Sequence, residues 1–303
     1  MTHHIGRFAP SPSGPLHSGS LLAAVASYVD AKAHKGQWLL RIEDVDRHRT
    51  VKGSRDSILN SLEQHGLLWD GAIEQQTDNN DRYEAALEQL QQQQRIFFCQ
   101  CTRTALKQIA GPYPGTCRAE KSSRYAAATR HQPASHSLRF ECGVETIDFT
   151  DRILGSQSFE LTQLGDFILR RRDSLFAYQL AVVIDDAAQS VTSVVRGADL
   201  LSSTPWQIAL QQALGLPSMD YAHLPLITDA NNGDKLSKQT GAKAINNSTA
   251  ASNIHLSLTQ LGQPLPEQAH RLSVNQLLEW AIEHWQIKQI PKTAIIVTES
   301  QTN

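Results

Sequence analysis

Apolar and polar positions in the N-terminal part of the chain follow an order that predicts strand, loop, helix and strand. Residues 5–9 are apolar enough for a short strand, and residues 10–15 are mostly Pro, Ser and Gly. Apolar side chains then recur at helical spacing over 18–35, and Gly36 ends the pattern. The apolar run 38–42 fits a strand buried in a parallel sheet, with acidic residues directly after it. We expect a βαβ unit whose ligand-binding groups lie at the carboxyl ends of its strands.

The pattern changes between residues 97 and 159, where the segments become short and Gly, Pro and Ser interrupt them. Within this region, 137–140 and 146–149 predict two paired strands. Beyond it, apolar runs predict that the sheet resumes with strands at 176–186 and 191–195. Amphipathic spacing predicts further helices around residues 58–62, 83–90, 204–214, 254–258 and 277–281.

Strands that alternate with helices in this way favour an α/β fold with a doubly wound parallel sheet. The irregular region interrupts the alternation, so we interpret it as an insertion between the two halves of the sheet. The predicted parts are a first Rossmann-like half at 1–96, an α/β insertion at 97–160, a second Rossmann-like half at 161–240 and a small helical C-terminal subdomain at 241–303.

Composition and charge narrow the possible functions. A chain of 303 residues is longer than one hydrophobic core usually spans, and 40% apolar residues can bury a sizeable core. The net charge of −2 gives no global positive field, so any contact with nucleic acid has to be local. The longest apolar run, 21–26, is far shorter than the roughly 20 residues that cross a bilayer, and the N-terminus lacks a secretory pattern. We expect no membrane partner and a cytoplasmic location.

Four cysteines are too few for a disulfide scaffold, and three of them, Cys99, Cys101 and Cys117, lie close together in the sequence. Three thiolates with a fourth N or O ligand suit tetrahedral zinc, and Tyr113 lies among them, although tyrosine is an uncommon ligand. Buried free thiols are the alternative interpretation. Cys142 stands apart, and we expect it to be a core or surface thiol.

The loop formed by residues 10–20 leads directly into the first predicted helix. A helix N-terminus offers unpaired N–H groups and the positive end of its dipole to an anion. Gly14 and Gly19 would let a phosphate approach the backbone closely, and His17 could donate a hydrogen bond to it. An ordinary Pro/Ser turn with a helix cap explains the same residues without a ligand.

A second loop, 233–239, places Lys235 and Lys238 three residues apart after a glycine. A flexible lysine suits charge that develops on phosphate only in a transition state. Taken alone, such a loop is more often a solvated surface turn.

Charged residues near the predicted strand ends indicate a class of substrate. Arg7 and Arg196 could each bind a carboxylate, while Glu43 could hold an ammonium group. An amino acid with two carboxylates matches this set, whereas each residue alone is more typical of a surface ion pair. The concentrated basic run 170–172 fits either RNA phosphates or a solvated helix end.

Four motifs occur along the chain in this order: Arg-Phe-Ala-Pro-Ser-Pro-Ser-Gly from Arg7, His-Ser-Gly-Ser from His17, Arg-Ile-Glu-Asp from Arg41 and Lys-Leu-Ser-Lys from Lys235. In this order they resemble the class I aminoacyl-tRNA synthetases of the glutamyl type. The second motif matches the HIGH element and the fourth matches the KMSKS element, both of which bind ATP in that family. Ser20, Leu236 and Gln239 depart from these elements, which bears on the turnover rate more than on the type of reaction.

The resemblance implies a site for ATP with Mg²⁺ and a site for glutamate. It makes His17 and Lys238 the catalytic residues. The ATP-binding residues that it implies are His17, Gly19, Ser20, Lys235, Ser237 and Lys238. The glutamate-binding residues that it implies are Arg7, Ser11, Glu43, Tyr178 and Arg196. Short relatives of the glutamyl type carry one structural zinc, which implies the ligands Cys99, Cys101, Tyr113 and Cys117.

The segment after Lys238 is too short for the anticodon-binding region of a glutamyl-tRNA synthetase. This length, the Cys-x-Cys insertion and the variant ATP motifs resemble the glutamyl-queuosine tRNA(Asp) synthetase family. That family implies a monomer that activates L-glutamate with ATP and transfers the glutamyl group to queuosine at the wobble position of tRNA(Asp).

Three other functions stay open at this point. A truncated synthetase would charge the 3′ end of tRNA(Glu), and the position of the ester would distinguish it. A small-molecule nucleotidyltransferase would have no use for a glutamate pocket. A non-catalytic RNA-binding relative would fail to bind ATP.

Overall fold

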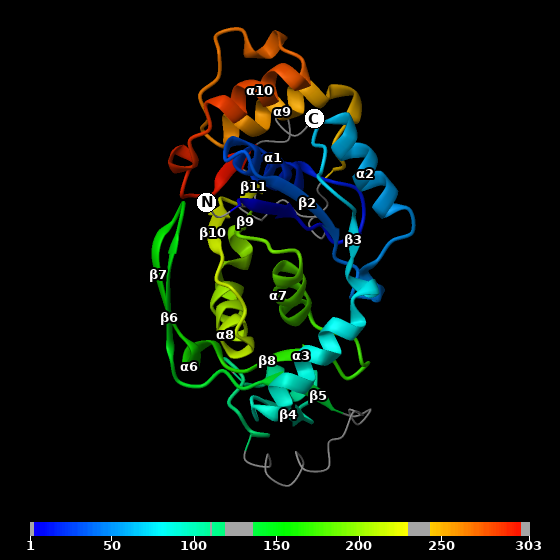
Figure 1. Ribbon diagram of the computed structural model, residues 1–303, viewed down its shortest axis with the longest axis vertical. Helices are drawn as coiled ribbons and strands as arrows, with labels where there is room; N and C mark the ends of the chain where they lie inside the picture. Colours follow the sequence, from blue (N-terminus) through cyan, green and yellow to red (C-terminus); the bar gives the residue numbers. More distant parts are fainter. Residues whose placement is uncertain (1–2, 110, 119–135, 230–242, 298–303) are drawn as a thin grey trace.

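A computed structural model describes residues 3–109, 111–118, 136–229 and 243–297. The molecule is elongated, with a parallel sheet and its covering helices at one end and a small antiparallel sheet at the other (Figure 1). No helix in these residues combines the length and the apolar character that crossing a bilayer requires.

Two groups of strands lie at this end, and all of their strand pairs are parallel except β6 with β7, which is antiparallel. The first group, in spatial order, is β1 (Ile5–Phe8), β2 (Gln37–Ile42) and β3 (Glu74–Gln75), all parallel. The second group, in spatial order, is β7 (Gly155–Glu160), β6 (Thr146–Asp151), β10 (Asp220–Leu224) and β9 (Ser193–Gly197). The groups meet where the Thr192 N–H donates to the Ile5 carbonyl at 2.9 Å. The predicted parallel α/β sheet is therefore confirmed.

Helix α1 (Ser18–Ala33) connects β1 to β2 as the sequence predicts. It ends one turn before Gly36, where a glycine is required because a Cβ would lie 2.1 Å from the His4 carbonyl oxygen. Leu21 and Val25 on α1 are buried in the larger of the hydrophobic clusters. The close approach at Gly36 lets the chain turn directly from helix into strand.

The C-terminal helices lie against α1. Helices α9 (Ala250–Gln260) and α10 (Val274–Glu283) contribute Ile254, Leu258 and Leu277 to the same hydrophobic cluster as Leu21. Helix α2 (Ser54–Gln64) lies at the edge of this layer (Figure 1). The short parallel pair β11 (Ile227–Asp229) and β12 (Ile295–Val297) places residues close to the C-terminus beside the segment that follows β10. The helices expected at 254–258 and 277–281 are confirmed.

A second hydrophobic cluster fills the other end of the molecule. Its antiparallel sheet has the order β4 (Ile96–Cys99), β5 (Ser137–Phe140) and β8 (Phe167–Arg170). The helices of this end are α3 (Asn80–Gln92), α4 (Arg103–Lys107), α6 (Leu161–Leu164), α7 (Tyr178–Ala188) and α8 (Thr204–Leu214). Phe140, Leu90 and Leu180 are buried together in this second cluster.

Two predicted features, one in the second half and one in the insertion, are wrong. The apolar run 176–186 forms helix α7 and not a strand, because α7 is buried on most of its circumference and its Val and Ile residues imitate the composition of a strand. The segments 137–140 and 146–149 are both strands but do not pair with each other. β5 pairs with β4 and β8, whereas β6 pairs with β7 and β10, so the two lie in different sheets.

Candidate active site

The loop before α1 is fixed by backbone hydrogen bonds to three other segments. Pro10 O accepts from the Glu43 N–H at 3.0 Å, Pro12 O accepts from the Val51 N–H at 2.9 Å, and Leu16 O accepts from the Ile245 N–H at 3.0 Å. Gly14 has a φ of 136°, which strongly favours glycine. The loop is therefore a rigid bridge between the end of β2 and the N-terminus of α1.

His17 caps α1, and its partner is Ser20. The His17 N–H donates to Ser20 Oγ at 2.9 Å, and the Ser20 N–H donates to His17 Nδ1 at 3.3 Å. Because Nδ1 accepts a hydrogen bond, the ring proton of the neutral imidazole lies on Nε2. His17 Nε2 is thus a hydrogen-bond donor. Ser20, the departure from the HIGH element, builds the cap that fixes this tautomer.

Glu43 follows β2 and is almost completely buried, with 8% of its side chain exposed. Its Oε1 lies 3.6 Å from Arg41 and has no hydrogen-bond donor among the described residues. Burial raises the pKa of Glu43 to about 7, although Arg41 and Arg7 oppose the shift. Ser11 and Glu43 line a small pocket together with Pro12, Asp46, Arg49 and Thr50. Glu43 therefore lies beside a small pocket and keeps a buried carboxylate oxygen without a hydrogen-bond donor among the described residues.

Arg7 and Arg41 converge on one carboxylate of α7. The Arg7 Nε donates to Asp186 Oδ1 at 3.1 Å, and Arg41 donates to the same oxygen at 2.6 Å. All three side chains are buried, and the two guanidinium groups keep the pKa of Asp186 below its usual range despite its burial. The Nε side of Arg7 therefore binds a carboxylate of the protein itself. The sequence instead indicates that Arg7 binds a carboxylate of the substrate.

Asp185, the neighbour of Asp186, accepts three hydrogen bonds from α3 and the segment before it. The donors are Tyr83 Oη at 2.6 Å, Asn79 Nδ2 at 2.9 Å and Gln76 Nε2 at 3.0 Å. Sequence reasoning missed both aspartates as parts of the site. The available signal was a pair of charged residues at the end of a strongly apolar run, because buried charges require partners.

Arg196 lies at the carboxyl end of β9 and is 5% exposed. Its NH2 donates to Thr204 Oγ1 at 2.8 Å, its Nε donates to His223 Nε2 at 3.2 Å, and its NH1 lies 3.4 Å from the Tyr178 hydroxyl. The structure thus brings two of the predicted glutamate-binding residues, Arg196 and Tyr178, into contact. Sequence reasoning missed Thr204 and His223, which no motif marks.

The basic run 170–172 is engaged within the protein. Arg170 pairs with Glu84, Arg171 pairs with Asp46 at 3.2 Å, and Arg172 donates to the Gln100 carbonyl. The three side chains therefore bridge α3, the loop after β2 and the end of β4.

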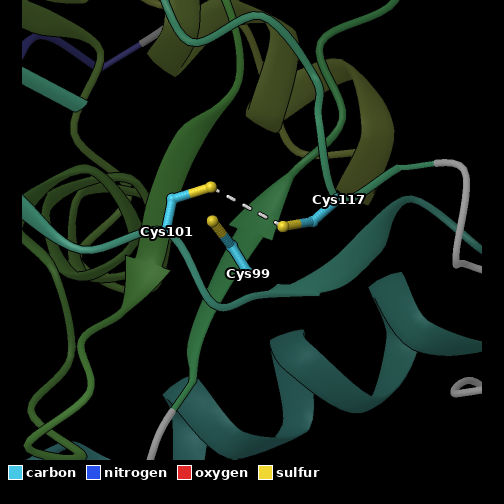
Figure 2. Close-up of side chains that lie close together, drawn as sticks. All are labelled: Cys99, Cys101 and Cys117. Carbon is cyan, nitrogen blue, oxygen red and sulfur yellow. Dashed lines mark hydrogen bonds between the residues drawn. The ribbon is translucent and has the colours of Figure 1, made fainter. Parts of the chain in front are cut away.

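The three predicted thiol ligands lie together at the end of β4 (Figure 2). The sulfur atoms of Cys99, Cys101 and Cys117 are all within 4.8 Å of one another, and Cys101 Sγ is 3.7 Å from Cys117 Sγ. Four sulfur ligands around tetrahedral zinc, each about 2.3 Å from the ion, would be about 3.8 Å apart. Tyr113 Oη is 3.5 Å from Cys99 Sγ and accepts from the Cys117 N–H at 2.9 Å. The donor atoms present therefore fit a zinc ion.

The thiols of this cluster shift one another's pKa. Burial raises the pKa of Cys99, but hydrogen bonds from Tyr113 and Arg139 outweigh it and lower the pKa to about 7. Burial and the neighbouring thiols Cys117 and Cys99 raise the pKa of Cys101 to about 11. Several thiolates this close repel one another, and a divalent cation removes that repulsion.

Cys142 is separate from this cluster. It is buried, and its thiol donates to the Gly165 carbonyl.

A second group of possible ligands, His4, Asp30 and His34, lies by the amino end of β1, whereas Arg7 lies toward its carboxyl end. Asp30 is already paired with Arg152 at 2.7 Å and accepts from Trp285 at 2.9 Å. The group therefore ties the start of the chain, α1 and the C-terminal segment together.

The structure describes only some of the predicted ATP-binding residues. His17, Gly19 and Ser20 stand at the N-terminus of α1. Lys235, Ser237 and Lys238 lie outside the described residues. The nearest described residues on their C-terminal side lead to Ile245, which is hydrogen-bonded to Leu16 directly before His17.

Comparison with known proteins gives close relatives over the whole chain. The profile described as tRNA synthetases class I (E and Q), catalytic domain, matches residues 5–258. A glutamyl-Q tRNA(Asp) synthetase from Serratia proteamaculans is 44% identical, over 99% of this chain and 96% of that protein. Proteins of the same name from Pseudomonas aeruginosa and Methylococcus capsulatus are 43% and 46% identical, over 98% and 94% of this chain and 98% and 92% of those proteins.

A solved structure shares the fold. A glutamate tRNA ligase from Elizabethkingia meningosepticum superposes with a TM-score of 0.82 at 24% identity, and the match covers 100% of this chain and 68% of that one. The profile match and the curated relatives show the family as well as the fold. The chain belongs to the class I tRNA synthetases (E and Q) and, among them, to the glutamyl-Q tRNA(Asp) synthetase family.

Proposed function

We propose that this protein activates L-glutamate with ATP and transfers the glutamyl group to the queuosine base at the wobble position of tRNA(Asp). The observation that carries the proposal is a buried set of charges at the carboxyl ends of β1, β2 and β9, in which Glu43 has an oxygen without a donor. The names of the relatives supply the RNA substrate. We propose that the active unit is a monomer.

Glu43, Arg196, Arg7, Ser11 and Tyr178 form the proposed glutamate site. Glu43 receives the ammonium group, because its buried Oε1 lacks a donor that a cation would provide. Arg196 receives a carboxylate through NH1, next to the Tyr178 hydroxyl. Arg7 adds positive charge while Asp186 fixes its position. Ser11 shares the pocket of Glu43.

The ATP site in this proposal is the N-terminus of α1 together with Lys235, Ser237 and Lys238. His17 Nε2 donates to a phosphate oxygen, and the N-terminal N–H groups at Gly19 and Ser20 add the favourable end of the helix dipole. Mg²⁺ bound with ATP neutralises charge on the phosphates. The hydrogen bond from Ile245 to Leu16 supports this site, because it ties the chain beyond the lysine loop to the segment that carries His17.

The chemistry takes two steps and needs no protein nucleophile. An oxygen of the glutamate α-carboxylate attacks the α-phosphorus of ATP, and the bond to the bridging oxygen breaks, so that pyrophosphate leaves. A hydroxyl of the cyclopentenediol ring of queuosine then attacks the acyl carbon, loses its proton and displaces AMP. His17 and Lys238 stabilise the charge that develops on the leaving pyrophosphate.

The finer features of the proposed architecture are one structural zinc and a helical C-terminal subdomain. The ligands of the zinc are Cys99, Cys101, Tyr113 and Cys117, and their arrangement supports a closed site without an exchangeable position. Zinc there would hold the end of β4 against the segment around Tyr113. Helices α9 and α10 support the helical character of the C-terminal part.

Amino-acid-dependent exchange of pyrophosphate into ATP tests the activation step. With Mg²⁺ and no tRNA, glutamate should support exchange at least tenfold above glutamine or aspartate, because only glutamate offers two carboxylates at the spacing of the proposed pocket. Exchange that does not depend on any amino acid would show a nucleotidyltransferase, and a protein that fails to bind ATP would be a non-catalytic relative.

A further inference from the structure

A row of buried, hydrogen-bonded side chains on three neighbouring strands fixes the position of Arg196. Arg196 on β9 and His223 on β10 are register partners in neighbouring parallel strands, so their side chains lie side by side. Arg196 Nε donates to His223 Nε2 at 3.2 Å, and His223 Nδ1 donates to Asp151 Oδ2 on β6 at 2.6 Å. His223 is completely buried and Asp151 is 1% exposed.

The protonation of His223 follows from these partners. Its Nδ1 faces a carboxylate and must carry the proton, while its Nε2 faces the Arg196 guanidinium and must accept. Burial and the nearby Arg196 lower the pKa of His223, although Asp151 opposes the shift, so the neutral ring is the stable form. The ring therefore links a fixed anion to a cation without adding charge of its own.

Several further hydrogen bonds fix the position of Asp151. Besides the imidazole, it accepts hydrogen bonds from the N–H groups of Ile153 and Leu154 at 2.9 and 2.8 Å, and from the His223 N–H at 3.3 Å. These donors keep the carboxylate ionised, and they lower the pKa of Asp151 despite its burial.

The hydrogen bonds to Arg196 determine which nitrogen of its guanidinium group can face a ligand. His223 takes Nε, and Thr204 together with the Leu200 carbonyl takes NH2. NH1 is the nitrogen that reaches toward Tyr178. A guanidinium is planar and rigid, so fixing Nε and NH2 also fixes the direction of NH1.

We infer that His223 is a positioning residue for glutamate: with Asp151 behind it, His223 orients Arg196 so that NH1 faces a carboxylate of the bound amino acid. The inference rests on the proposed function, because it assigns glutamate as the ligand of Arg196. His223 itself touches no substrate.

Two substitutions of the same residue separate positioning from simple structural support. His223→Asn keeps a donor at the place of Nδ1 for Asp151 but has no acceptor at the place of Nε2. His223→Gln keeps an acceptor at the place of Nε2 but loses the donor to Asp151. Glutamate-dependent pyrophosphate exchange gives KM for glutamate, KM for ATP and kcat, and thermal unfolding gives Tm for each variant.

His223→Asn should raise KM for glutamate by about tenfold or more, the change expected when a charged group loses one hydrogen bond, with KM for ATP unchanged. His223→Gln should keep KM for glutamate within threefold of the parent and should have the lower Tm of the two. Asp151→Asn, which leaves the imidazole in place, should raise KM for glutamate at least threefold and serves if His223→Asn is insoluble.

The inference is overturned if KM for glutamate stays within twofold in both His223→Asn and Asp151→Asn, or if the Asn and Gln variants raise it equally. KM does not depend on the fraction of folded enzyme, so partial misfolding does not disturb this comparison. The parent protein provides the separate check on the proposed function, because an absence of glutamate-dependent exchange in the parent would refute that function before any variant is compared.

Discussion

At the scale of single residues, the site combines buried charges that the sequence partly reveals. Glu43 and Arg196 stand in recognisable motifs or after apolar strands, so their chemistry can be read from the sequence. The partners that orient them, such as Asp186 and His223, come from segments far along the chain. A sequence gives residue types and spacing, but it does not give the pairs that a fold creates between distant segments.

Glu43→Gln should make the protein more stable and less active. The pKa of Glu43 in the folded protein, about 7, lies above its ordinary value of 4.5, so the folded state binds more protons between these values and stability falls as pH rises through this window. Removing the charge should raise the free energy of unfolding above pH 7 by something on the order of 2–3 kcal/mol. Chemical denaturation at pH 5 and pH 8 measures this difference, which should be small at pH 5.

The same residue predicts a pH profile of activity. Below about pH 7, protonation of Glu43 removes the charge that holds the ammonium group, so kcat/KM for glutamate should fall with decreasing pH. Glu43→Gln should raise KM for glutamate at least about tenfold and abolish this acidic limb. An unchanged profile in the variant would exclude Glu43 as the titrating group.

Lys238→Ala tests the residue taken from the KMSKS resemblance. Loss of one transition-state donor should slow adenylate formation about 10²- to 10³-fold, with less effect on the affinity for ATP. Single-turnover formation of glutamyl-adenylate measures the step directly, and Lys243→Ala, a lysine close by in the sequence, is the matched control. Near-normal adenylate formation by Lys238→Ala would refute the assignment.

At the scale of elements, most predicted strands and helices are confirmed, and the exceptions have physical causes. Helix α1 shows a clear helical pattern and a capped start, and β1 and β2 are compact apolar runs. Helix α7 is buried on most sides, so no polar face marks its period, and its apolar run is indistinguishable from a buried strand. The pairing of β5 and β6 could not be predicted either, because neighbouring strands in sequence can join different sheets.

Helix α7 carries the carboxylates that neutralise the arginines of the site. Asp186→Asn should leave Arg7 and Arg41 buried without the negative charge that accepts their hydrogen bonds and lower the free energy of unfolding by about 3 kcal/mol. The control is Asp173→Asn, an exposed partner of Arg171, which should change it by less than about 1 kcal/mol. Equal effects of the two substitutions in denaturant titrations would contradict this role of α7.

At the scale of the whole molecule, the parallel sheet with the proposed glutamate and ATP sites lies at one end, and the cysteine cluster lies by the small antiparallel sheet at the other (Figure 1, Figure 2). The proposed division of the chain into four parts stays a prediction. The cluster is far from the proposed reaction, so zinc there should affect stability and RNA binding more than activation.

Cys117→Ser tests this separation. The parent protein should contain one zinc ion by elemental analysis and the variant should contain less, with a lower Tm because a structural zinc contributes to folding. Glutamate-dependent pyrophosphate exchange should stay within about threefold of the parent at a temperature where the variant is folded. The control, Cys142→Ser, should keep the zinc. A parent protein purified with zinc supplied throughout that still contains none would contradict the proposed site.

Transfer of labelled glutamate to tRNA tests the central claim most directly. The protein is incubated with ATP, Mg²⁺, labelled glutamate and tRNA from normal or queuosine-deficient cells, with a parallel sample treated with periodate beforehand. Label should appear only on queuosine-containing tRNA, map to the anticodon loop and disappear after periodate cleaves the ring diol. Equal labelling of both tRNA pools at the 3′ end would contradict the account and show a short acceptor-end synthetase.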